Sequence, residues 1–172
     1  YNYNTKVVYR STDMGLHWNK LNLSPEGLGG DFFIGASGKF YFTKYTFGKY
    51  TLKCSSDLGA TWALVNTNVP SRYILETRAG SLIAHTATAI YRSVDGGLNW
   101  ALVSSVGAQT LTEWKPGLLM DWKDNSNNNK NGILSTDDGA TWNSFNNGQL
   151  QYGFQSIAVM SKDTFFAGGY PD

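Results

Sequence analysis

The sequence predicts an all-β fold, a β-propeller built from four-stranded antiparallel blades. Three observations support this prediction. The pattern Ser-x-Asp-x-Gly-x-x-Trp occurs four times in 172 residues, segments of alternating apolar and polar residues surround each copy, and 15% aromatic residues and 19 glycines are combined with only 4 prolines. Such a composition suits short strands joined by tight turns rather than a helical bundle.

We call each copy of this pattern a box. The boxes span residues 11–18, 55–62, 93–100 and 135–142, so that their aspartates are separated by 44, 38 and 42 residues. A period near 40 with a recurrent tryptophan is typical of a radial β repeat. The shared positions are Ser11, Asp13, Gly15, Trp18, Ser55, Asp57, Gly59, Trp62, Ser93, Asp95, Gly97, Trp100, Ser135, Asp137, Gly139 and Trp142.

Each box is predicted to be the turn of a β-hairpin. Strand-like segments precede the boxes at 5–10, 50–54, 89–92 and 132–134, and others follow at 62–65 and 100–103. The Asp side chain can accept backbone hydrogen bonds across the turn, the Gly can adopt a positive φ, the Ser adds a local hydrogen bond, and the Trp packs on the blade. We therefore interpret these residues as scaffold.

Two further strands precede the box in each internal repeat. They are predicted at 31–36 and 39–43, at 72–77 and 81–85, and at 110–114 and 118–122, with Gly38, Gly80 and Gly117 in the connecting turns. Each repeat therefore reads as a four-stranded blade with the box between its third and fourth strands.

The four boxes resemble Asp-boxes, the bacterial neuraminidase repeats (BNR) of sialidases, xyloglucanases, sortilin-type receptors and photosystem II assembly factors. The resemblance rests on all four copies and implies a β-propeller fold. In those families the boxes lie away from the active face, so the resemblance implies no single activity.

The chain is predicted to be one domain, 1–172, and its two ends are expected to share a blade. Residues 155–160 and 164–167 look like the first two strands of a repeat, and the N-terminal residues supply a third and fourth. The blades would then be 155–172 plus 1–23, 30–67, 72–104 and 109–146, closing a four-bladed ring. Six or more blades, as in the resembling enzymes, would require further sequence, so membership of a larger chain or assembly stays open.

The face opposite the boxes is the expected binding face, because the loops between blades and between second and third strands meet there. These loops are predicted at 24–30, 45–49, 66–71, 85–88, 104–108, 122–131 and 147–153. Rings combined with amide side chains suit glycan or protein recognition, although the same rings would also serve to cap the blade ends. The candidate ligand-binding residues are Tyr45, Phe47, Arg72, Trp122, Tyr152 and Tyr170.

Two carboxylates occupy equivalent positions on neighbouring innermost strands. Glu76 and Glu113 each lie four residues before the glycine of the turn that follows. Such a pair would serve as general acid and base or nucleophile in glycoside cleavage, or would hold a cation. The structural alternative, which we favour, is that both are satisfied by Arg78 or by backbone donors, or that they line a solvated channel wall.

Sialidase activity is disfavoured by the arginines. Cleavage of a sialoside needs several arginines around one carboxylate, and the chain has only Arg10, Arg72, Arg78 and Arg92. Arg10 and Arg92 each precede a box serine and belong to the structural turns. The Phe-Arg-Ile-Pro segment by which sialidases resemble one another has no match either.

No metal site or cofactor is predicted. Residues 124–128 have oxygen-bearing side chains like the start of a calcium loop, but Asn129 replaces the required glycine and Ser135 stands in place of the bidentate glutamate. His17 lies in a box turn and His85 ends a strand, without a second zinc ligand at suitable spacing. We expect an Asn-rich loop and two structural histidines.

Charge and hydropathy limit the partners. With 14 basic and 13 acidic residues there is no electrostatic footprint for nucleic acid, and no apolar run is long enough for membrane insertion. Cys54 is the only cysteine, so an internal disulfide is excluded. The resemblance implies an extracellular or cell-surface location.

Three functions remain open from the sequence. The leading hypothesis is a non-catalytic module that recognises a glycan or a protein through the aromatic loop face. The second is a glycoside hydrolase, or a fragment of one, that uses Glu76 and Glu113. The third is a structural docking module of a larger surface complex. Enzyme activity is thus undecided, with the balance toward a binding role.

Overall fold

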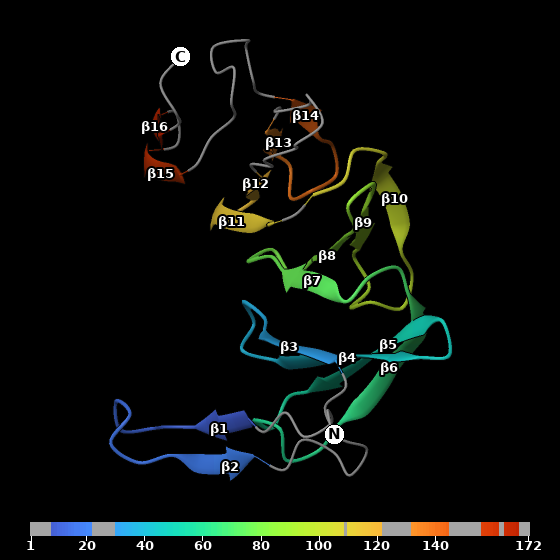
Figure 1. Cartoon of the computed structure of the whole chain (residues 1–172), viewed down its shortest axis with the longest axis vertical. Coiled ribbons are helices and arrows are strands. Elements are labelled where there is room, and N and C mark those ends of the chain that lie inside the picture. Colours follow the sequence, from blue (N-terminus) through green and yellow to red (C-terminus); the bar gives the residue numbers. More distant parts are fainter. Residues whose placement is uncertain are drawn as a thin grey trace, which may run out of the picture.

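The computed structural model describes residues 8–21, 30–108, 110–121, 132–144, 156–161 and 164–168. Within these ranges the regular secondary structure consists of strands, all paired antiparallel. The sheets follow one another along an arc from β1–β2 to β15–β16 (Figure 1). The predicted all-β class is therefore confirmed.

Three complete four-stranded blades form the middle of the arc. The first blade consists of β3 (Gly30–Ile34), β4 (Phe40–Thr46), β5 (Lys49–Ser55) and β6 (Ala63–Val69). The second consists of β7 (Tyr73–Glu76), β8 (Leu82–His85), β9 (Ile90–Ser93) and β10 (Ala101–Ser104). The third consists of β11 (Thr112–Lys115), β12 (Leu118–Asp121), β13 (Ile133–Ser135) and β14 (Asn143–Ser144). The strands are paired in sequence order, and a box joins the third to the fourth strand of each blade, as predicted.

Two-stranded sheets lie at the two ends of the arc. β1 (Val8–Arg10) pairs with β2 (Asn19–Leu21), and β15 (Ser156–Ser161) pairs with β16 (Thr164–Gly168). Among the described residues these pairs are separate sheets, so the blade of 155–172 plus 1–23 stays a prediction. A shared blade needs hydrogen bonds between β16 and β1, whereas the arc between them stays open in Figure 1.

The core lies between successive blades. Because side chains alternate across a strand, β8 contributes to both of its neighbours. Leu82 and Ala84 belong to an apolar cluster with Leu52 of the preceding blade, and Ile83 belongs to a second cluster with Leu119 of the following blade. All five side chains are fully buried. Burial between blades therefore fixes the position of each blade relative to the next.

Two predicted loops are shorter than expected. β4 extends to Thr46 and β5 begins at Lys49, so the 45–49 loop is reduced to a two-residue turn, and β6 extends to Val69 into the predicted 66–71 loop. The hairpin is extended by a cross-strand pair, Tyr45 opposite Tyr50, whose ring centroids are 4.9 Å apart. Aromatic cross-strand pairs stabilise antiparallel strands, which explains why pairing continues past the predicted loop boundary.

Candidate functional site

The second box shows how the repeated residues make a turn. The Ser55 hydroxyl donates to Asp57 Oδ1 over 2.7 Å and accepts from the Gly59 N–H over 2.8 Å. Asp57 Oδ1 also accepts from the Thr61 N–H over 2.8 Å, and the Trp62 indole N–H donates to the Gly59 carbonyl over 3.2 Å. Every polar group of the pattern is thus used within the turn.

The same bonds recur in the other boxes. In each, Ser accepts from the Gly N–H, Asp accepts from the N–H four residues on, and Trp donates to the Gly carbonyl. The glycines have φ between 79° and 100°, and the residue before each is left-handed as well, as at Leu58 and Asp138. Trp18 differs from the other box tryptophans because 61% of it is exposed.

These hydrogen bonds explain the low pKa values of the box aspartates. Bonds from the Thr61 side chain and backbone and from Ser55 lower the pKa of Asp57 to about 2. The backbone and side chain of Asn99, with Ser93, do the same for Asp95. The pKa values of Asp13 and Asp137 are also lowered. A carboxylate held ionised by turn donors is a scaffold group and is poorly suited to proton transfer at neutral pH.

Glu76 is a buried link between two blades. Its Oε2 accepts from the Ser37 N–H over 3.0 Å and from the Ser37 hydroxyl over 2.6 Å, and its Oε1 accepts from the Tyr41 hydroxyl over 2.9 Å. Ser37 lies in the β3–β4 turn of the preceding blade, where Gly35 leaves room for the carboxylate: a Cβ there would lie 2.0 Å from Oε2. Burial, followed by the bond to Glu76, raises the pKa of Tyr41.

Glu113 makes an equivalent link one blade further along. Its Oε2 accepts from the Arg78 N–H over 2.8 Å, in the β7–β8 turn, and its Oε1 accepts from the Gly117 N–H over 3.1 Å. Each carboxylate is therefore committed to the innermost turn of the preceding blade. These contacts fit the structural alternative: the donors are backbone N–H groups and the hydroxyls of Ser37 and Tyr41, and Arg78 contributes its backbone rather than its guanidinium.

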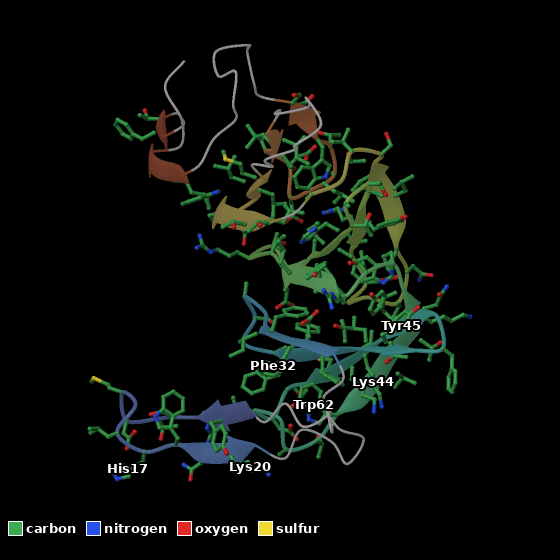
Figure 2. The ribbon with its side chains drawn as sticks, viewed as in Figure 1. His17, Lys20, Phe32, Lys44, Tyr45 and Trp62 are labelled. Atoms are coloured by element: carbon green, nitrogen blue, oxygen red, sulfur yellow. The ribbon has the colours of Figure 1, made fainter. Side chains whose placement is uncertain are left out.

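Two of the predicted ligand-binding residues lie on the β4–β5 hairpin. Tyr45 is 56% exposed and Phe47 is 99% exposed. Tyr45 lies in the strand rather than in a loop, and its ring packs against Tyr50. Figure 2 shows Tyr45 near the hairpin end, at the opposite side of the view from His17 in the first box turn.

Arg72 lies immediately before β7, and its side chain stacks on that of Tyr73. Its guanidinium carbon is 4.5 Å from the centre of the Tyr73 ring, its Nη2 donates to the Tyr73 hydroxyl, and its Nε forms an ion pair with Asp31 Oδ2 at 3.3 Å. The Tyr73 ring is in turn stacked on the His85 ring, and the two ring centroids are 5.5 Å apart with an angle of 20° between the ring planes. Buried His85 Nδ1 donates to the Ala108 carbonyl over 2.9 Å, which fixes its ring.

These two groups lie on neighbouring blades, and we call them together the aromatic cluster: Tyr45, Tyr50, Arg72, Tyr73 and His85. The Thr43 hydroxyl on β4 donates to the Arg72 carbonyl over 3.3 Å, which joins the two groups. Sequence reasoning missed Tyr50, Tyr73 and His85 as members. The alternation in β7, with Tyr73 exposed and Ile74 buried, was the signal that would have identified Tyr73.

The remaining predicted site residues lie outside the described part of the chain. They are Trp122, Tyr152 and Tyr170, together with the Asn-rich segment 124–128. Among the described residues, no group of three or more His, Cys, Asp or Glu side chains is placed to hold a metal ion. Over the same ranges, no helix has the length and apolar character needed to cross a membrane.

Comparison with known proteins supports the fold. No family model matches the chain, and the curated proteins contain no match. A solved structure described as YCF48 bound to D1 peptide is similar, with a TM-score of 0.65 and 21% identity over 95% of this chain and 55% of that chain. A structure of NanB with Optactamide has a TM-score of 0.45 and 20% identity over 74% of this chain and 25% of that one.

The likeness to YCF48 is one of fold, since only about a fifth of the aligned residues are identical. The present chain spans 55% of the length of that chain. The structural similarity to YCF48, together with the three complete blades and their repeated hairpin turns, shows that this chain has a β-propeller fold.

Proposed function

We propose that the chain is a non-catalytic recognition module that binds a protein segment through the aromatic cluster. The observation that carries this proposal is the stack in which Arg72 and Tyr73 are exposed above buried His85, on the blade next to the Tyr45–Tyr50 pair. Rings held in place by their neighbours supply contact area with little loss of conformational entropy on binding. Arg and Tyr are also the residue types enriched among binding hot spots.

The cluster offers both apolar and polar contacts. Tyr73 is 46% exposed, and the Arg72 side chain is 48% exposed despite its ion pair with Asp31. A guanidinium held over a ring presents donors that can bind main-chain carbonyls or carboxylates of a peptide. The YCF48 structure contains a bound peptide, which makes a peptide the first ligand class to test on this fold.

The hydrolase alternative has less support. Glu76 is 9% exposed and accepts three hydrogen bonds from the neighbouring blade, and Glu113 accepts two backbone bonds. Both carboxylates are thus engaged by donors of the scaffold. The docking-module alternative uses the same aromatic cluster and differs only in whether the partner is permanent.

We propose an extracellular or cell-surface location. Fractionation of the source cells tests it, and finding the protein in the cytosol alone would contradict it.

Selection of a random peptide library against the purified chain tests the proposal. Selected peptides should bind with an affinity that falls at least about 10-fold in Tyr73→Ala and in Arg72→Gln, as expected for hot-spot residues. Phe166→Ala is the matched control, because Phe166 is 61% exposed on β16, outside the cluster. A circular-dichroism melt of each variant confirms that it is folded.

Binding that survives both cluster substitutions would overturn the proposal. A glycan array run in parallel separates the remaining classes. Glycan binding lost in Tyr73→Ala, with no selected peptide, would replace the protein ligand with a sugar. Hydrolysis of a glycan panel that disappears in Glu76→Gln would support the enzyme instead.

A further inference from the structure

The β4–β5 hairpin is longer than the equivalent hairpin of the next blade. β4 and β5 are paired from Phe40 opposite Ser55 to Thr46 opposite Lys49, seven residue pairs, whereas β8 and β9 are paired over four, from Leu82 opposite Ser93 to His85 opposite Ile90. Three additional pairs extend the hairpin by roughly 10 Å at the strand rise of about 3.3 Å per residue. Its end projects from the side of the arc in Figure 1.

The hairpin ends in a turn that an aromatic residue fits poorly. Phe47 has φ of 49° and Gly48 has φ of 84°. Two-residue hairpin turns with two positive φ values favour Asn-Gly or Gly-Gly, and a bulky residue in the left-handed region is strained. Among the described residues the other non-glycine positions of positive φ are Met14, Leu58 and Asp138, all at the same position of a box.

No packing contact explains Phe47. Its side chain is 99% exposed, and a Cβ built on neighbouring Gly48 would meet nothing within 4 Å. The ring therefore adds nothing to the core while it occupies a conformation that Asn or Gly would adopt more readily. Strain of this kind, without a structural benefit in the free chain, is a reason to look for a binding role.

The rest of the hairpin end is chemically two-sided. Residues directly opposite each other share a face, so Tyr45 and Tyr50 lie on one face and Lys49 lies on the other. The Tyr45–Tyr50 ring contact stiffens the stem immediately below Phe47. The end thus presents a single phenyl ring at its apex, aromatic area on one side and the exposed Lys49 on the other.

We infer that Phe47 is an anchor that inserts into an apolar pocket on a folded protein partner, with an acidic group of that partner beside Lys49. This inference rests on the proposed function and deepens it, because it names the anchor residue and the shape of the partner surface. A phenyl ring without a polar atom suits a pocket better than it suits a glycan, whose hydroxyl groups need hydrogen bonds.

A lipid surface fits the observations less well. Only one projecting aromatic apex is present in the described part of this face, since the equivalent turn of the next blade, 86–89, has Thr, Ala, Thr and Ala. One ring can fill one pocket, whereas a flat bilayer surface is better bound by several apolar side chains at equal height. A membrane is therefore treated as an outcome of the test.

The experiment places the photo-crosslinker p-benzoylphenylalanine at position 47 of the full chain and, as a control, at position 166. Both chains are irradiated in an extract of the source cells. The expected result is one protein crosslinked from position 47 and not from position 166. That protein is purified, and its affinity is measured for the wild type, Phe47→Asn, Phe47→Leu, Tyr73→Ala and Phe166→Ala.

The inference expects two opposite effects of Phe47→Asn. The melting temperature should rise by about 2 °C, because Asn tolerates the left-handed turn. Affinity for the crosslinked protein should fall at least about 10-fold, as for a hot-spot residue. Phe47→Leu should bind better than Phe47→Asn, because it keeps apolar volume, and Phe166→Ala should bind like the wild type.

Several results would overturn the anchor. One is the absence of a crosslink specific to position 47. Another is an affinity unchanged in Phe47→Asn but reduced in Tyr73→Ala, which would leave the proposed function standing; insensitivity to both substitutions would remove both proposals. A third is sedimentation of the wild type, but not of Phe47→Asn, with phosphatidylcholine–phosphatidylserine vesicles, which would show that the hairpin contacts lipid.

Discussion

Arg92 on β9 and Asp138 in the fourth box tie two neighbouring blades together at two points. Arg92 Nη2 donates to Asp138 Oδ2 over 2.8 Å, and Arg92 Nε donates to the Asp138 carbonyl over 2.8 Å. The Ser81 hydroxyl donates to the same carboxylate oxygen. Burial opposes ionisation of Asp138, but bonds from Ser81, Thr77 and Arg92 outweigh it and hold its pKa below the ordinary value.

Asp138→Asn should therefore destabilise the propeller. Asn tolerates the φ of 60° at this position, so the substitution removes the charge without straining the turn. We expect the free energy of unfolding to fall by about 1–2 kcal/mol, measured by urea denaturation. A double-mutant cycle with Arg92→Met isolates the pair, and a coupling energy near zero would contradict this assignment.

Leu58→Asp should stabilise the equivalent junction two blades earlier, between the β1–β2 sheet and the β3–β6 blade. Arg10 precedes the first box serine as Arg92 precedes the third, and Leu58 follows the second box aspartate as Asp138 follows the fourth. The Leu58 side chain offers no acceptor, and among the described residues Arg10 Nε is buried without a hydrogen-bond partner. A carboxylate at position 58 should add up to about 1 kcal/mol, because Asp also suits the φ of 59° there better than Leu. As a control, Leu58→Asp is also made in the Arg10→Met background, where the gain in unfolding free energy should disappear. A gain that persists without Arg10 would show that only the turn was improved.

The box aspartates should make the protein sensitive to acid. Their folded pKa values lie below the unfolded value of 3.8, at about 2 for Asp57 and Asp95. Their contribution to stability is therefore complete above pH about 4 and is lost as pH falls toward about 2. Melting temperatures between pH about 5 and about 2 should decline steeply for the wild type and less steeply for Asp57→Asn. Equal slopes for the two proteins would argue against the turn bonds as the cause.

Glu76→Gln should lower the free energy of unfolding of the propeller, while the protein that remains folded should bind its ligand as the wild type does. The Gln amide group would place a donor toward Ser37 or Tyr41, both of which donate to Glu76. For a carboxylate that is 9% exposed we expect a loss of about 2–4 kcal/mol. Tyr41→Phe and Ser37→Ala, which each remove one donor, should lose less. A Glu76→Gln protein of wild-type stability would show that the carboxylate is not a structural link.

Much of the local structure could be predicted from the sequence. The box residues Ser, Asp, Gly and Trp form a closed set of bonds within eight residues, so their pattern determines the turn without help from distant parts of the chain. Strands and turns were found at the predicted places for the same reason, since alternation and glycine positions are local signals. The length of β4 and β5 was underestimated, because the Tyr45–Tyr50 contact that extends them joins two strands.

Residue contacts between blades were decided only by the tertiary structure. The sequence showed that Glu76 and Glu113 are equivalent, but the approach of each to the turn of the preceding blade depends on how the blades are rotated against each other. The same packing brings Arg72 of one blade to Asp31 and Thr43 of the preceding blade. Bonds closed within a few residues were thus set by the sequence alone, whereas contacts across the junction between blades required the packed core to bring their partners together.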